Sequence, residues 1–286
     1  MRRYMLLIKA TADYEAGKLP DEPTLHQHAD YIQELVQAGA LVGCERLQPS
    51  SQGVRVHFAN GKFTVTDGPF TETKELVAGF CMIRAASLEE AVGWARRMPF
   101  QREEIDVRPL FELEDFPVDP AEKPDGWRDK ETEMRTASPP VRKPDTQRYM
   151  GLLKADPDTE AGVLPDEKVL SAMGAFIEDG VKAGIFLSGE GLQPSSQSAR
   201  IRSSGGKRIV LDGPFTETKE LVAGYAILQF ASRAEAIEWT KRFVQVDAPG
   251  RYGGECVCEL RPVFEFGQFG DSPAIRRFRE MGASAR

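Results

Sequence analysis

Runs of consecutive apolar residues alternate along the chain with segments whose apolar residues recur every three or four positions. The runs at 5–8 and 80–83 are apolar at successive positions, which is typical of strands buried on both faces. Residues 23–38 carry an apolar stripe at helical spacing, and Asn-Gly at 60–61 is a strong hairpin signal. This pattern predicts the order β-α-β-β-β-α-β.

The same order occurs twice, because residue n matches residue n+145 without a gap over positions 4–98. Of these 95 pairs, 48 are identical. The longest identical stretch, DGPFTETKELVAG, occupies 67–79 and 212–224, and LQPSSQ occupies 47–52 and 192–197. The chain is therefore expected to contain a duplicated domain.

The repeat divides the chain into two copies, 1–114 and 148–269. Between them, 115–147 is rich in proline and charge and is expected to be an extended linker, while 270–286 is a tail expected to form a frayed or surface helix. Two helices per copy cover only one face of a sheet whose strands are buried on both faces. We therefore expect the two sheets to pack face to face, as a pseudo-dimer within one chain.

The stretch DGPFTETKE at 67–75 and again at 212–220 resembles the signature of the DGPF family, a branch of the YCII-related proteins. The stretches ERLQP at 45–49 and EGLQP at 190–194 resemble its second characteristic motif. The resemblance implies an α+β fold with ferredoxin-like domains of the dimeric α/β-barrel type. It implies little about the reaction, because most members of the family have no assigned activity.

Composition narrows the classes of function. The formal net charge is −7 and no apolar run approaches the length of a membrane-spanning helix, so neither a nucleic-acid nor a membrane partner is expected. The four cysteines show neither a dense disulfide framework nor a metal-ligand spacing, which favours the cytoplasm. Without a glycine-rich phosphate loop either, we expect no metal and no cofactor.

Asp67 and Asp212, which open the repeated signature, are the first candidate catalytic residues. An aspartate before Gly-Pro stabilises a turn by accepting backbone N–H groups, and this is the favoured interpretation. The alternative is a general base at the mouth of a cleft. The charged residues that follow predict either a solvated loop or a ligand-binding loop: Glu72, Lys74, Glu217 and Lys219.

Glu45 and Glu190 lie near the ends of otherwise apolar strands. Each either faces the cleft between the copies with a raised pKa, suited to proton transfer, or faces water. Gln48 and Gln193, three residues on, either orient a ligand or cap the following turn.

All three histidines lie in the first copy. His28 has the spacing to Gly39 at which YCII-type proteins place their active-site histidine, so the resemblance makes it a candidate acid–base residue. The partner aspartate of the family is replaced by Met98-Pro99-Phe100, which leaves the pair incomplete. An exposed helical histidine is the alternative, and a surviving site would lie in the first copy.

Three functions remain open. The first is binding of an unknown small molecule, with acid–base catalysis in the cleft of each domain or between the domains. The second is an accessory or regulatory module, because DGPF-like domains resemble proteins linked to alternative sigma factors of bacteria. The third is a structural interaction domain, and further self-association of the chain is compatible with each.

Overall fold

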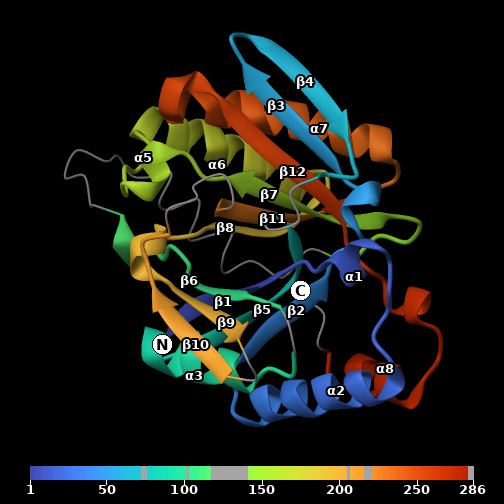
Figure 1. The fold of residues 1–286 in the computed structure, drawn as a ribbon. Coiled ribbons are helices and arrows are strands. Elements are labelled where there is room, and N and C mark those ends of the chain that lie inside the picture. Colours follow the sequence, from blue (N-terminus) through green and yellow to red (C-terminus); the bar gives the residue numbers. More distant parts are fainter. Residues whose placement is uncertain (72–75, 101–102, 117–140, 205–206, 216–220, 283–286) are drawn as a thin grey trace.

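The computed structural model describes residues 1–286 except 72–75, 101–102, 117–140, 205–206, 216–220 and 283–286. In this part of the chain two six-stranded antiparallel sheets face each other, and helices cover their outer faces (Figure 1). The fold is therefore α+β, with two tandem ferredoxin-like units packed sheet to sheet. Most of the predicted linker lies outside the described residues.

Both copies follow the predicted element order, except that a short helix, α1 or α5, lies where a loop was expected after the first strand. The first contains β1 (Arg2–Lys9), α1 (Ala12–Glu15), α2 (Glu22–Gln37), β2 (Leu41–Arg46), β3 (Val54–Ala59), β4 (Lys62–Asp67), β5 (Val77–Ala85), α3 (Leu88–Arg97) and β6 (Ile105–Pro109). The second contains β7 (Gln147–Lys154), α5 (Pro157–Glu160), α6 (Glu167–Lys182), β8 (Phe186–Gly191), β9 (Ala199–Ser204), β10 (Lys207–Asp212), β11 (Val222–Phe230), α7 (Arg233–Asp247) and β12 (Cys256–Pro262), followed by α8 (Pro273–Glu280).

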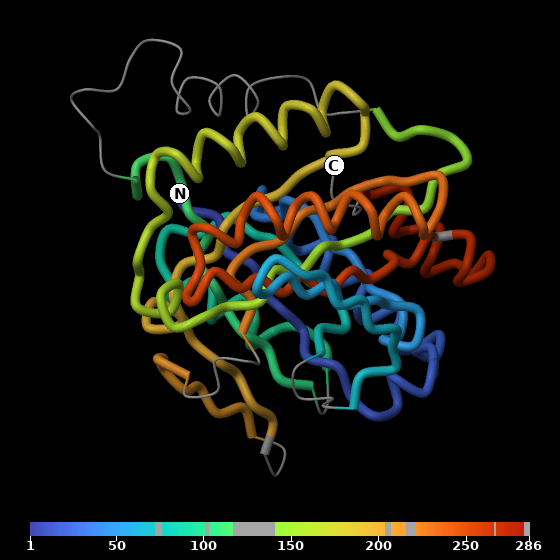
Figure 2. The backbone as a smooth tube through the Cα atoms, turned by 90° about the horizontal axis from the view of Figure 1, so that it is seen from above, coloured from blue at the N-terminus to red at the C-terminus, as the bar shows by residue number. Residues whose placement is uncertain are grey.

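The helix starts are set by side-chain caps. Asp21 and Asp166 accept the backbone N–H three residues on, at 3.0 and 2.9 Å, and so begin α2 and α6. Ser87 and Ser232 do the same for α3 and α7, and a glutamate in each first turn bonds back to the residue before the cap. The long helices α6 and α7 lie side by side over the second copy's strands (Figure 2).

Each copy gives one hairpin to the other copy's sheet. The sheet orders are β10-β9-β6-β1-β5-β2 and β4-β3-β12-β7-β11-β8. The β3–β4 hairpin thus extends the second copy through β12, with Val56 opposite Cys258, and β9 pairs with β6, with Ile201 opposite Ile105 (Figure 1). Because backbone hydrogen bonds cross between the copies at both hairpins, neither sheet is complete without the other half of the chain.

The inner faces of the two sheets form a continuous apolar core, as the sequence pattern predicted. Met5 and Leu7 of β1 meet Met150 and Leu152 of β7 in one buried cluster, and each is at most 1% exposed. The alternate residues of β1, Tyr4 and others, pack against the helices on the outer face. The face-to-face pseudo-dimer within one chain is therefore confirmed.

The tail forms a packed helix. In α8, Ala274 and Ile275 are buried, and Phe278 and Met281 rest against the outer core of the first copy. Arg277 donates to Asp30 of α2 at 2.8 Å. Helix α8 is thus a surface helix packed beside α2 in the first copy's outer layer rather than a frayed end.

The four cysteines divide into two kinds. Cys44 of β2 and Cys81 of β5 are directly opposite in register and form a disulfide. Cys256 and Cys258 are buried free thiols on one face of β12. No group of His, Cys, Asp or Glu among the described residues could hold a metal ion. None of the helices in the described ranges has the length and apolar character needed to cross a membrane.

Candidate functional site

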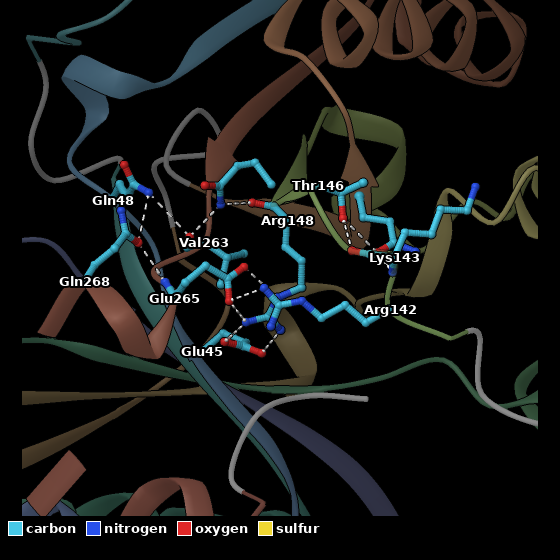
Figure 3. Close-up of polar contacts among 11 residues, drawn as sticks. Glu45, Gln48, Arg142, Lys143, Thr146, Arg148, Val263, Glu265 and Gln268 are labelled. Carbon is cyan, nitrogen blue, oxygen red and sulfur yellow. Dashed lines mark hydrogen bonds and ion pairs between the residues drawn. The ribbon is translucent and has the colours of Figure 1, made fainter. Parts of the chain in front are cut away.

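The predicted carboxylates Glu45 and Glu190 bind arginines of the opposite copy. Glu45 is 7% exposed and accepts from Arg148 at 2.5 Å, and Arg148 also donates to Glu265 at 3.1 Å (Figure 3). Burial alone would lower the pKa of Arg148, but the two carboxylates outweigh it and the pKa is raised. Glu45 faces neither water nor an open cleft, as the two interpretations had it, but a buried guanidinium.

The second copy repeats this arrangement from the other side. Arg3 donates to Glu190 at 2.6 Å and to Glu112 at 2.6 and 2.9 Å. Both arginines occupy the same position in the repeat, and both reach a glutamate on the opposite sheet. These two arginine–glutamate pairs, Arg148 with Glu45 and Arg3 with Glu190, are called the clamps below. They link the copies at two related points, so the four side chains have a structural role that their sequence positions did not reveal.

The two signature motifs pack against each other. Ser50 of the LQPSSQ stretch accepts the backbone N–H of Phe70 at 3.1 Å, and Ser195 accepts that of Phe215 at 3.0 Å. A Cβ placed on Gly68 would lie 1.8 Å from the carbonyl oxygen of Ser50, so only glycine fits there. The signature therefore encodes a close contact between two loops, and the turn is held by the serine hydroxyl.

Asp67 and Asp212 are exposed at the ends of β4 and β10. The carboxylate of Asp67 accepts from Arg233 of the second copy at 2.5 Å, with 71% of its side chain exposed. The other charged candidates of this loop, Glu72, Lys74, Glu217 and Lys219, lie outside the described residues.

Asp67 and Gln48 share a polar groove of about 420 Å³ between the copies, with Gln147 and Arg233 on its other side. Gln48 also donates to the Val263 carbonyl at 3.4 Å. Its counterpart Gln193 donates to Asp115 at 2.9 Å. In these bonds both glutamines reach the other half of the chain and not the turn that follows each of them.

His28 lies on α2 close to Arg46, Glu103 and the backbone of Pro99. Burial and the positive charge of Arg46 lower its pKa to about 4, and Glu103 and Pro99 only partly oppose this. The imidazole is therefore neutral at pH 7, and it is half-buried. It could accept a proton only well below neutrality.

A cavity of about 260 Å³ lies in the second copy, between the outer face of its sheet and helices α6 and α7. Its wall is mainly apolar and includes the aromatic side chains of Phe176, Phe186, Trp239, Phe243, Phe111 and Phe116. The last two follow β6 of the first copy, so both halves of the chain build the wall. No histidine lines this cavity, and neither Asp67 nor Asp212 reaches it.

The repeat itself explains why the cavity is in the second copy. Small residues form its floor where the first copy has larger ones: Gly151 for Leu6, Gly189 for Cys44, Gly191 for Arg46, Ala226 for Cys81 and Thr159 for Tyr14. In the first copy Leu6 is fully buried, and Arg46 lies over the Tyr14 ring at 5.3 Å. The same space is thus filled in one copy and open in the other.

The candidate residues chosen from the sequence were mostly those kept in both copies, and the cavity is lined by positions that changed. Of the candidates, Glu190 lines it. The signal that could have found the cavity was present in the sequence: a set of large-to-small differences, all in the second copy, on β7, β11, the edge strand β8 and the short helix α5.

The chain resembles known proteins both in sequence and in structure. It is 35% identical over 97 residues to an uncharacterised protein of Rhizobium meliloti (strain 1021), an alignment that spans 33% of this chain and 78% of that protein. Among solved structures it is similar to a mutant chlorite dismutase from Candidatus Nitrospira defluvii in complex with cyanide, with 12% identity, a TM-score of 0.39 and coverage of 98% and 93% of the two chains. Another chlorite dismutase mutant gives 11% identity and a TM-score of 0.41.

These structural scores are too low to carry an argument about function. The profile of the YCII-related domain, in contrast, matches twice, over residues 2–114 and 147–266. The two matches cover most of the sequence and correspond to the two copies of the repeat. The chain belongs to the family of proteins with a YCII-related domain and carries that domain in tandem.

Proposed function

We propose that this protein binds one small, mainly apolar molecule in the cavity of its second copy. The observation that carries the proposal is the replacement of larger side chains by glycine and alanine on strands of the second copy and by threonine on α5, which opens about 260 Å³. An apolar cavity of about 150 Å³ is enough for benzene, so this one suits a molecule of two fused rings. The family signature supports assignment of both copies to the DGPF branch.

One site per chain follows from this proposal, in contrast to a site in each domain. The sequence expectation placed a surviving site in the first copy, near His28, where Leu6, Arg46 and the Cys44–Cys81 pair occupy the corresponding space. We place the ligand in the second copy for that reason. The negative net charge supports a protein without a nucleic-acid partner, and cytoplasmic location stays part of the proposal.

Acid–base catalysis in the same cavity is the second candidate, favoured by one observation. Glu190 lines the apolar wall, and its carboxylate is held by Arg3 at 2.6 Å. A carboxylate at an apolar site is a group that can transfer a proton. A regulatory module would begin with the same binding step, so the two differ in whether the bound compound is changed.

The test is binding of naphthalene, a rigid molecule with two fused rings and no polar group. We expect a rise in melting temperature that grows with naphthalene concentration, since a ligand of the folded state stabilises it by mass action. Saturation-transfer NMR reports the contact directly. No detectable binding in a solution saturated with naphthalene would refute the proposal. Mass spectrometry of recovered ligands, with and without Glu190→Gln, then separates turnover from binding.

A further inference from the structure

We propose that the natural ligand of this cavity is an uncharged molecule with an apolar body and one hydroxyl group, and that the hydroxyl binds between Arg251 and Asp156. The inference rests on the proposed function and names the class of molecule that the site selects. It is carried by a buried guanidinium nitrogen of Arg251, which lines the cavity, by the carboxylate oxygen of Asp156 that lies 3.6 Å from it, and by the charges around them.

Arg251 comes from a segment that the first copy lacks. The second copy has eight extra residues between its last helix and last strand, and Gly250 and Arg251 from this insertion line the cavity. The side chain of Arg251 is 8% exposed, and its Nε donates to Asp247 at 2.5 Å. Burial alone would lower the pKa of Arg251, but Asp247 and Asp156 help to raise it, which keeps the guanidinium charged.

One nitrogen of this guanidinium has no hydrogen-bond partner among the described residues. Nη1 of Arg251 is buried and makes no hydrogen bond with any described residue, and the same holds for Oδ2 of Asp156. The two atoms are 3.6 Å apart, an ion-pair contact that is longer than a hydrogen bond. Asp156 uses its other oxygen to cap Thr159, a residue of the cavity wall. The first copy has Thr11 in place of Asp156.

The charges decide which polar group fits. One guanidinium meets two carboxylates here, because Asp247 also binds Arg251 and accepts from Cys256 at 3.4 Å. A ligand carboxylate would add a third negative charge beside these two carboxylates. A ligand ammonium has donors but no acceptor, so it could not accept from Nη1. A hydroxyl can do both required tasks, accepting from Nη1 and donating to Oδ2. It satisfies two buried polar atoms without adding charge.

The test compares three molecules with the same two-ring body at pH 7: naphthalene, 2-naphthol and 2-naphthoate. The proposal predicts that 2-naphthol binds about tenfold more tightly than naphthalene, as expected for one well-placed hydrogen-bonding group, and that 2-naphthoate binds most weakly. Isothermal titration calorimetry measures all three. Equal affinities for 2-naphthol and naphthalene, or tightest binding of 2-naphthoate, would overturn the inference and leave the proposed cavity in place.

A single substitution should invert the preference. Asp156→Asn keeps an oxygen to cap Thr159 but turns the free atom into a donor and removes one negative charge. In this variant 2-naphthoate should gain at least tenfold and 2-naphthol should lose its advantage over naphthalene. Asp21→Asn, the same change at the exposed cap of α2, is the matched control and should leave all three affinities unchanged. Should Asp156→Asn fail to fold, the wild-type comparison decides alone. Failure of all three ligands to bind would refute the proposed function and this inference with it.

Discussion

Filling the cavity from its floor tests the relation between the two copies most directly. Gly151→Leu gives the second copy the residue that Leu6 provides in the first. A Cβ at Gly151 would have Cys258 Sγ at 3.5 Å and the Ala226 carbonyl at 3.9 Å, both ordinary contacts. Since the residue lies in a strand and on the same face as Tyr149 and Leu153, its new side chain points toward the helices and into the cavity.

The expected gain in stability can be estimated from transfer and packing terms. Burial of a leucine side chain contributes about 1.5–3 kcal/mol, and loss of glycine from the unfolded chain adds about 0.4–1 kcal/mol. Imperfect packing removes about 1–3 kcal/mol. The net expectation is a free energy of unfolding higher by about 1 kcal/mol, and a melting temperature higher by about 2–4 °C.

The assay pairs urea denaturation with naphthalene titration. Gly151→Leu should be at least as stable as the wild type and should no longer be stabilised by naphthalene. Gly93→Leu is the matched control, because Gly93 is exposed on α3 with no atom within 4 Å of an added Cβ. It should keep the full ligand effect. A Gly151→Leu protein that is folded and still binds naphthalene with wild-type affinity would show that the ligand is held elsewhere.

Three further outcomes follow from the contacts described above. His28 has a pKa of about 4 in the folded chain and about 6.5 in the unfolded chain, so the unfolded chain binds the proton first as the pH falls. The free energy of unfolding should therefore decrease between pH 6.5 and pH 4, by at most about 3 kcal/mol. His28→Met should flatten this part of the pH profile in urea titrations, and an unchanged slope would contradict the assignment. Arg148→Met should cost about 3–5 kcal/mol because it strands Glu45, and adding Glu45→Gln should restore part of the loss in a double-mutant cycle; additive losses would exclude the clamp. Asp67→Asn should lower the free energy of unfolding by less than about 1 kcal/mol and leave naphthalene binding intact. Gly68→Ala, in contrast, should prevent folding, as measured by circular dichroism. A folded Gly68→Ala protein would count against the close contact of the two signature loops.

Much of the fold could be predicted because its determinants are local. The doubly apolar run at 5–8 required two buried faces, and the structure gives β1 helices on one side and β7 on the other. The turn at 60–61 has positive φ at Asn60 and Gly61, as an Asn-Gly hairpin requires. Residue patterns of this kind report how a segment is buried, and burial on both faces was enough to infer sheet-to-sheet packing.

The exchange of hairpins between the copies could not be predicted, because no local sequence pattern determines which strand pairs with the outer edge of β6 or β12. Val56 pairs with Cys258 about two hundred residues away, and a hairpin packed on its own copy would have the same alternation. The clamp between Glu45 and Arg148 has the same origin. A glutamate at a strand end is compatible with water, a cleft or a cation, and the choice depends on which sheet lies opposite.

The cavity differs from these two features, because the sequence does contain its determinants. They become visible only when the two copies are compared position by position. A void of 260 Å³ that stayed empty and dry would cost up to about 6 kcal/mol at roughly 24 cal/mol per Å³, a large part of the 5–15 kcal/mol by which domains are stable. The first copy keeps Leu6 and Tyr14 buried, and the shared inner core and exchanged hairpins tie the second copy to it. One half of a duplicated chain can then carry a cavity that a lone domain of this size would tolerate poorly. Occupancy by an apolar ligand would remove most of the cost, which is why a duplication with one filled and one open copy favours binding at a single site.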